Sequence, residues 1–232
     1  MITFPPQLLD GYRSFSTHRL PTEQSRYQDL SLRGQSPEVM VIGCCDSRVS
    51  PEVIFDAGPG ELFVVRNVAN LVPVYEPDER AHGISAALEY AVNVLRIKHL
   101  VVLGHAHCGG IRAFIDKIEP LSPGDFIGRW MQLFVRPGEI VEQRAGETMA
   151  QFTERVEKAA LFRSIDNLMT FPFIRNAVER DQLQVHGAYF GIAEGALFVF
   201  DKNEKVFLRV GQQTPVAGSG ETNEEPAITP GA

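Results

Sequence analysis

Two short runs of apolar residues constrain the fold of this chain more than any other feature. VMVIGC spans residues 39–44 and HLVVLGH spans residues 99–105, and each is almost continuously apolar. Runs of this length without polar alternation indicate strands that are buried on both faces of a sheet. ELFVVRN at residues 61–67 predicts another strand, and residues 184–191 and 196–201 predict a closing strand pair.

Helical segments alternate with these strands. Residues 81–94 place Ala, Leu, Tyr and Val at helical spacing, and residues 108–118 begin a helix after a glycine-rich turn. Residues 139–181 are charge-rich and favour helix, with an interruption near Pro172. The alternation predicts an α/β fold in which helices flank a mostly parallel central β-sheet.

The two ends of the chain differ from this central pattern. Residues 1–34 are polar with scattered apolar side chains, which predicts an N-terminal helical arm with breaks at Pro21 and Gly34. Residues 211–232 are small, polar and rich in Pro and Gly, which predicts a disordered tail. Between them, residues 35–210 are expected to form one α/β domain.

Composition argues against several kinds of partner. The 232 residues carry a formal net charge of -7, so a nucleic-acid surface is not expected. The chain has no run of about 18 apolar residues, so no membrane span is expected. The first residues lack a charged stretch before a long apolar run, so we expect no secretory signal. The three cysteines cannot all pair, which fits a reducing compartment and predicts a cytoplasmic protein.

Three metal-binding side chains lie where such a sheet gathers its ligands, at the carboxyl ends of strands. Cys44 ends one buried strand, His105 ends another, and Cys108 follows shortly after. Zinc uses a Cys-His-Cys set in catalytic sites, although cobalt or cadmium also fits such ligands. His107 is the rival nitrogen, but neighbouring side chains such as His107 and Cys108 rarely converge on one ion. The competing interpretation is that the two cysteines are buried apolar thiols.

An acid and a base follow the first ligand in GCCDSRV, residues 43–49. Arginine offers a rigid two-donor fork, so Arg48 is expected to hold Asp46 off the metal. Asp46 could then accept a hydrogen bond from water at the metal; the alternative is a purely structural Asp–Arg loop contact. Because side chains alternate along extended chain, Cys45 is expected to point away from Cys44 and to pack as a small buried thiol.

Taken together, these motifs resemble those of the β-class carbonic anhydrases. The paired signature of that family is C-x-D-S-R followed by H-x-x-C, found here at residues 44–48 and 105–108. The resemblance runs from about residue 35 to residue 201. Further segments are similar in order: GELFVVRNVAN at residues 60–70, SAALEYAV at residues 85–92 and HGAYFG at residues 186–191.

The resemblance implies a role for each residue of the two motifs. Cys44, His105 and Cys108 would be the zinc ligands, and Asp46 and Arg48 would be the catalytic dyad. The activity implied is reversible hydration of carbon dioxide to bicarbonate and a proton.

A second set of residues matches the substrate pocket of the plant-type members. Gln35 would hydrogen-bond the substrate, and Phe63, Val68 and Tyr90 would line the apolar pocket, with plain core packing as the alternative for these three. The backbone N–H of Gly109 would meet a substrate oxygen. In family dimers the partner subunit completes the pocket, so Phe63 and Tyr90 are expected to act across an interface. A homodimer or a dimer-based tetramer is therefore implied.

The chain departs from those members in which bicarbonate closes the active site from a second pocket. Val41 stands where they carry a tryptophan, and Phe190 where they carry a tyrosine. Arg66 alone remains of that pocket, and the alternative is that it belongs to the core around RNVAN. We therefore expect an open site, with Asp46 on Arg48 and water or a small anion on the metal.

Three other functions remain as alternatives. Carbon disulfide or carbonyl sulfide hydrolysis would use the same fold and ligands. A thiol redox or zinc-storage protein could be built on Cys44 and Cys45, but it gives no role to the Asp–Arg pair. A binding module that has lost catalysis is the third, although no dyad residue is missing.

Overall fold

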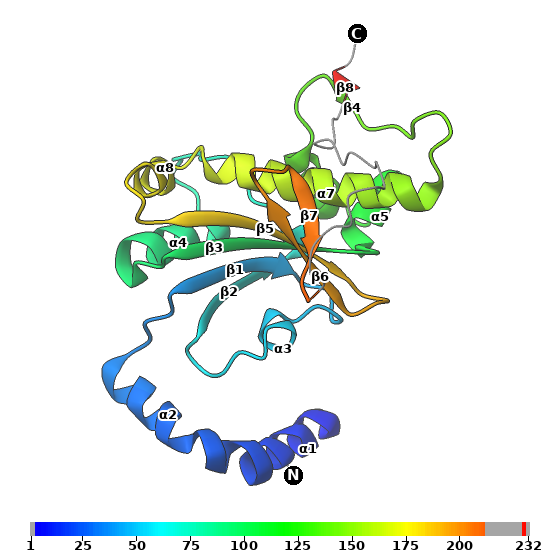
Figure 1. Cartoon of the computed structure of the whole chain (residues 1–232). Helices are drawn as coiled ribbons and strands as arrows, with labels where there is room; N and C mark the ends of the chain where they lie inside the picture. The colour runs from blue at the N-terminus through cyan, green and yellow to red at the C-terminus, as the bar shows by residue number, and fades with distance from the viewer. Residues whose placement is uncertain (1–2, 212–228, 231–232) are drawn as a thin grey trace.

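A six-stranded sheet forms the centre of the computed structural model, which describes residues 3–211 and 229–230 (Figure 1). Its strand order is β2-β1-β3-β5-β6-β7; the first four strands are parallel and the last two antiparallel. A separate pair joins β4 to β8. The predicted α/β fold with a mostly parallel sheet is thus confirmed. The strands are β1 Val39–Cys44, β2 Leu62–Asn67, β3 His99–His105, β4 Glu139–Ile140, β5 Gln184–Gly191, β6 Ala196–Asp201, β7 Val206–Arg209 and β8 Thr229–Pro230.

Helices lie on both sides of the sheet, and the N-terminal helices extend below it (Figure 1). The α-helices are α1 Pro6–Ser14, α2 Leu20–Arg33, α3 Pro51–Ile54, α4 Gly83–Glu89, α5 Gly109–Ile115, α6 Phe126–Met131, α7 Met149–Leu168 and α8 Pro172–Glu179. Two π-helical segments, Phe15–Arg19 and Tyr90–Leu95, continue α1 and α4, and two 3-10 segments are Val68–Asn70 and Gln132–Phe134. No helix among the described residues is both long and apolar enough to cross a bilayer.

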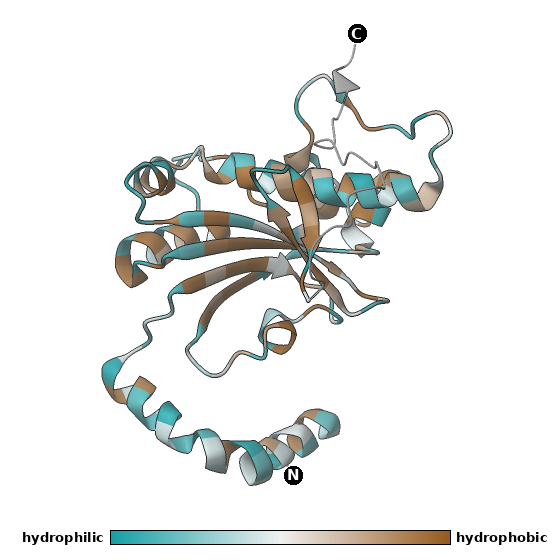
Figure 2. Ribbon diagram, in the orientation of Figure 1, coloured by the Kyte–Doolittle hydropathy of each residue, from teal (hydrophilic) through white to brown (hydrophobic). Residues whose placement is uncertain are grey.

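Apolar side chains bury both faces of the sheet, and Figure 2 shows its central strands as largely hydrophobic. On one face Met40 and Ile42 pack in a cluster with Leu161 of α7. On the opposite face Val41 packs in a cluster that includes Ile54 of α3. The last five residues of β1 are all buried, as expected for a central parallel strand. This burial fixes the strand ends that carry the candidate metal ligands.

The N-terminal arm does not break at Pro21, contrary to the sequence prediction. The helix continues through the π-helical segment Phe15–Arg19, and Pro21 lies in the first turn of α2. Because proline has no N–H, the helix passes this residue with one backbone hydrogen bond fewer. Gly34 does end the helix, at a φ of 79°. The arm contacts the body through the ion pair of Arg26 with Glu61.

The region predicted as helix from residue 139 becomes helical only at Met149. Thr148 and Gln151 form a capping box that starts α7 there. The preceding loop is tied to α7 by two arginines: Arg163 binds the carboxylate of Glu139, and Arg155 binds that of Glu147. Acidic residues between residues 139 and 148 therefore form ion pairs with α7 and do not indicate a helix of their own. The sequence analysis also does not predict the strand β7 or the short helices α3 and α6.

The predicted disordered tail, residues 211–232, lies outside the described residues except for Gly211 and residues 229–230.

The Glu147–Arg155 pair predicts a pH-dependent contribution to stability. The Arg155 guanidinium binds both Glu147 oxygens, at 2.8 and 2.9 Å, and this bond lowers the pKa of Glu147. A depressed pKa stabilises the fold above the unfolded value of about 4.3, and the contribution is lost as pH falls through the folded-state pKa. We expect Glu147→Gln to lower the free energy of unfolding by about 2 kcal/mol at pH 7, and by less in acid.

Urea unfolding at pH 7 and pH 3 checks this expectation. The control is Glu142→Gln, which changes an exposed carboxylate in the same loop and should leave the free energy unaltered. An equal loss of unfolding free energy in both variants at pH 7 would show that the Glu147–Arg155 ion pair does not stabilise the fold.

Candidate metal centre and active site

Three buried side chains from two neighbouring strands converge on one point. Cys44 is the last residue of β1, His105 is the last residue of β3, and Cys108 directly precedes α5. Their ligand atoms all lie within 4.8 Å of one another, and the two sulfur atoms are 4.0 Å apart. None of the three residues is more than 4% exposed. The structure therefore brings together the three residues that the sequence predicts as metal ligands.

The histidine of this cluster is oriented for a metal. His105 Nδ1 lies 2.9 Å from the carbonyl oxygen of Ala106, which places the proton on Nδ1. His105 Nε2 is buried without a hydrogen-bond partner. A metal-bound histidine normally donates its other ring N–H to a carbonyl in this way, so the residues fit a metal ion. His107, the rival nitrogen, is exposed and lies outside the cluster.

The two thiols of the cluster lie within hydrogen-bond distance of each other. The hydrogen bond with Cys108 lowers the pKa of Cys44, and the same bond raises the pKa of Cys108. The N–H of Ala69 also lies 3.3 Å from the Cys44 sulfur. Cys44 is therefore disposed to be a thiolate, the form that binds metals. A soft divalent cation would take the place of the proton between the two sulfur atoms.

Asp46 is held by Arg48 in a two-point contact beside the cluster. Arg48 Nε lies 2.9 Å from Asp46 Oδ1, and Nη2 lies 2.7 Å from Oδ2. This hydrogen bonding holds the pKa of Asp46 well below its usual range. Arg48 Nη2 also donates to the carbonyl oxygen of His107, at 3.1 Å. The pair thus joins the two metal-ligand loops while Asp46 stays outside the ligand cluster.

Arg66 supports the backbone around Cys44 and Asp46, a role that the sequence pattern alone does not reveal. Its Nε donates to the carbonyl oxygen of Cys44 at 2.9 Å, and its Nη2 donates to that of Asp46 at 2.7 Å. One half-buried guanidinium from β2 therefore fixes the backbone on both sides of Cys45. The sequence signal was the arginine of RNVAN, whose position opposite Gly43 follows from the parallel register.

Two of the five predicted substrate-pocket residues lie beside the metal ligands. Val68 directly precedes Ala69, whose N–H meets the Cys44 sulfur. The carbonyl oxygen of Val68 accepts a hydrogen bond from the indole N–H of Trp130. Gly109 adjoins Cys108, is exposed and has open space where a Cβ would stand. Both residues thus border the cluster.

The other three do not come near the ligands of their own chain. Phe63 is paired with Met40, four positions before Cys44, which is about 13 Å along the strand. The ring centroids of Tyr90 and Phe63 are 6.0 Å apart, and residue Tyr90 is 44% exposed. Gln35 precedes the start of β1 and is exposed. These residues lie towards the amino ends of the strands, away from the candidate metal centre.

Cys45 is exposed, so the prediction that it packs as a buried thiol is wrong. The strand ends at Cys44, and the Cys45 backbone N–H donates to the carbonyl oxygen of Asn67. Cys45 is thus the first residue beyond the strand, and its side chain is exposed whereas that of Cys44 is buried. The two adjacent cysteines therefore occupy different environments.

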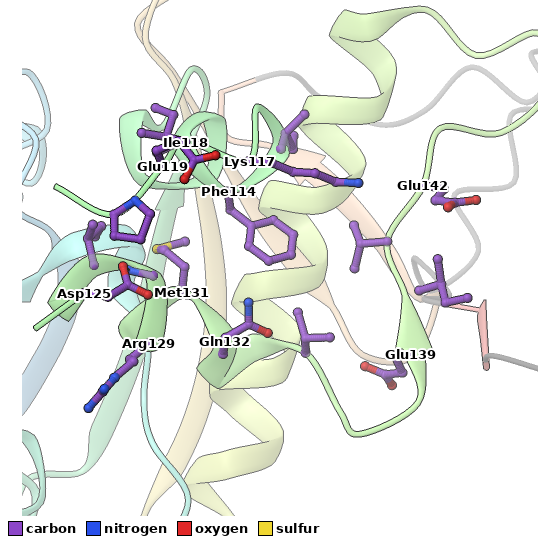
Figure 3. Close-up of a pocket in the computed structure, with 18 of the residues that line it drawn as sticks. Phe114, Lys117, Ile118, Glu119, Asp125, Arg129, Met131, Gln132, Glu139 and Glu142 are labelled. Atoms are coloured by element: carbon purple, nitrogen blue, oxygen red, sulfur yellow. The ribbon is translucent and has the colours of Figure 1, made fainter. Parts of the chain in front are cut away.

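A cavity lies elsewhere, between α5, α6 and the loop around β4 (Figure 3). Its volume is about 900 Å³, and Phe114 and Met131 are among its apolar lining residues. None of the three clustered ligands lines it. The candidate metal centre is instead a compact cluster at the carboxyl ends of β1 and β3.

Comparison with known proteins agrees with this fold and site. A family model described as carbonic anhydrase matches residues 39–197. Beta carbonic anhydrase 3 of Arabidopsis thaliana is 31% identical over 202 residues, which cover 86% of this chain and 78% of the relative. The structure of the β-carbonic anhydrase CcaA has a TM-score of 0.80 at 27% identity, covering 90% of this chain and 92% of that one. Two tetrameric β-carbonic anhydrases from Sordaria macrospora gave a structure with a TM-score of 0.69 at 28% identity, covering 90% and 98%.

The chain therefore belongs to the carbonic anhydrase family. Its relatives and structural neighbours place it in the β class, so it is a carbonate dehydratase, a lyase.

Proposed function

We propose that this enzyme catalyses the reversible hydration of carbon dioxide to bicarbonate and a proton at a zinc ion held by Cys44, His105 and Cys108. One observation carries the proposal: two thiols and an unpartnered imidazole nitrogen meet in a buried cluster. Three such ligands leave a fourth position open, as catalytic zinc sites do. Zinc in this position would lower the pKa of a bound water molecule towards neutrality.

The residues around the ligands supply orientation and an apolar wall. Asp46, fixed by Arg48, offers a carboxylate that accepts a hydrogen bond and so orients the attacking oxygen. Val68 gives an apolar wall against which carbon dioxide lies, and the N–H of Gly109 meets the oxygen on which charge develops. Because the two-point contact with Arg48 holds Asp46 beside the ligands, Asp46 does not take the fourth position and the site is open. Each carboxylate oxygen keeps a lone pair that can accept a further hydrogen bond.

The three remote pocket residues support a proposal about assembly. Gln35, Phe63 and Tyr90 lie far from the ligands of their own chain, so they would act on the site of a second copy in a homodimer or a dimer-based tetramer. The N-terminal arm, residues 1–34, exposes Leu8 and Tyr12, which suits packing on a partner. Light scattering of the purified protein tests this; a strict monomer with full activity would exclude it.

Two further expectations from the sequence remain proposals. We propose that residues 35–210 form one α/β domain and that the protein is cytoplasmic, with its three cysteines unpaired as a reducing compartment requires. Carbon disulfide and carbonyl sulfide are not favoured as substrates, because the family model and the relatives named above are carbonic anhydrases.

Stopped-flow carbon dioxide hydration together with a zinc assay tests the function. We expect about one zinc per chain and hydration at a rate far above the buffer background. Removal of zinc by a chelator should abolish hydration, because the lowered pKa of bound water depends on the ion, and added zinc should restore it. Full activity in the zinc-free protein would contradict the proposal, and turnover of carbon disulfide alone would reverse the choice of substrate.

A further inference from the structure

Glu157 of α7 is a buried acid that the proposed reaction does not use. The residue is only 4% exposed. Its Oε1 accepts a hydrogen bond from the backbone N–H of Cys108 at 2.9 Å, and its Oε2 accepts one from the hydroxyl of Tyr189 at 2.6 Å. We propose that Glu157 is a positioning residue that fixes the Cys108 turn for metal binding, with Tyr189 holding the carboxyl group in place. The proposal rests on the metal centre proposed above.

The turn from His105 to Cys108 requires such support. His107 adopts a φ of 56°, a left-handed conformation that is uncommon for residues other than glycine. Several backbone groups of the turn are bound by residues from other parts of the chain. The N–H of Ala106 donates to Phe190 of β5, and the carbonyl oxygen of His107 accepts from Arg48. The N–H of Cys108 donates to a side chain of α7, the carboxyl group of Glu157.

Close packing of α7 on the sheet brings Glu157 within reach of this turn. Leu161, one turn further along α7, lies 3.1 Å from the position of a Cβ on Gly104 and 3.0 Å from that of a Cβ on Gly187. A Cβ at either glycine would press on the Leu161 side chain, which would have to shift by a few tenths of an ångström. Gly104 directly precedes His105 in β3, so the same close approach that seats the helix sets the distance from Glu157 to Cys108.

The role of Glu157 depends on an acceptor oxygen rather than on its charge. A carboxyl oxygen can accept the Cys108 N–H whether or not the group is ionised, and a glutamine carbonyl can do the same. A methionine has nearly the same length but offers only a weak sulfur acceptor. Replacement by each residue in turn therefore separates the acceptor from the volume of the side chain.

The test compares Glu157→Gln, Glu157→Met and a matched control, Asn167→Leu. Asn167 is also buried on α7, and it donates to the carbonyl oxygen of Val72, away from the metal ligands. We expect Glu157→Met to weaken Co²⁺ and Zn²⁺ binding by about 10–100-fold and to change the visible spectrum of the cobalt-loaded protein. Glu157→Gln should stay within about threefold of wild type, and Asn167→Leu should lose stability without loss of metal affinity.

Amide hydrogen exchange in the metal-free protein gives a second measurement. The Cys108 N–H should exchange slowly in wild type and in Glu157→Gln, and at least about tenfold faster in Glu157→Met. Fast exchange of this N–H in wild type would overturn the proposal even where Glu157→Met does not fold. Equal metal affinity in Glu157→Met and wild type would also overturn it.

These readouts separate the failure of this proposal from the failure of the proposed function. A wild-type protein that binds no zinc and hydrates no carbon dioxide would refute the function. The exchange experiment on the metal-free chain would still report whether Glu157 fixes the Cys108 turn.

Discussion

Replacing Cys44 with alanine should abolish both zinc binding and carbon dioxide hydration. Cys44 is the ligand most disposed to be a thiolate, because Cys108 and the N–H of Ala69 both stabilise its charge. Without it, the site retains two protein ligands, too few for the three that catalytic zinc requires. We expect zinc content to fall below about a tenth of wild type and the hydration rate to fall about 10³-fold or more.

The neighbouring Cys45 provides the matched control for this experiment. It is also a cysteine and adjoins Cys44 in the chain, but it is exposed. Cys45→Ser should keep full zinc content and a rate within about twofold of wild type, because surface substitutions are usually mild. Hydration that survives in a zinc-free Cys44→Ala protein would refute the metal assignment. Loss of zinc in Cys45→Ser would show that the wrong thiol has been assigned.

The sequence could predict the central strands and the candidate metal ligands because both depend on local patterns. β1 and β3 are almost wholly apolar, and their last residues, Cys44 and His105, stand at the edge where parallel sheets gather ligands. Cys108 follows His105 by only three residues. The Asp46–Arg48 contact is likewise local, since two positions separate its members.

Features that depend on packing between distant segments could not be read in this way. Cys45 is exposed because the strand ends one residue earlier, which alternation alone does not reveal. Glu157 meets Cys108 only because α7 lies close to two glycines on neighbouring strands. By contrast, the distance of Phe63 from Cys44 could have been inferred, since Phe63 stands near the start of its predicted strand and Cys44 at the end of its own.

Replacing Asp46 with asparagine should remove most activity while zinc stays bound. An amide offers one acceptor oxygen in place of two, and its NH₂ group would face a donor of the Arg48 fork. The introduced amide would therefore turn its oxygen towards Arg48 and could no longer orient the attacking oxygen. We expect kcat to fall by about 10²–10⁴-fold, the range for loss of a positioned proton acceptor, with zinc content unchanged.

The zinc content of this variant decides between two states of the carboxylate. A suitable control is Glu52→Gln, which changes an exposed acid in the following turn and should leave kcat unaltered. If Asp46→Asn bound zinc markedly less tightly than wild type, Asp46 would be a metal ligand and the open site would be wrong. A rate within about threefold of wild type in the zinc-loaded variant would instead show that the Asp46–Arg48 contact is only structural. Retained zinc with lost turnover is the result that the two-point contact with Arg48 predicts, because that contact keeps the carboxylate beside the metal and not on it.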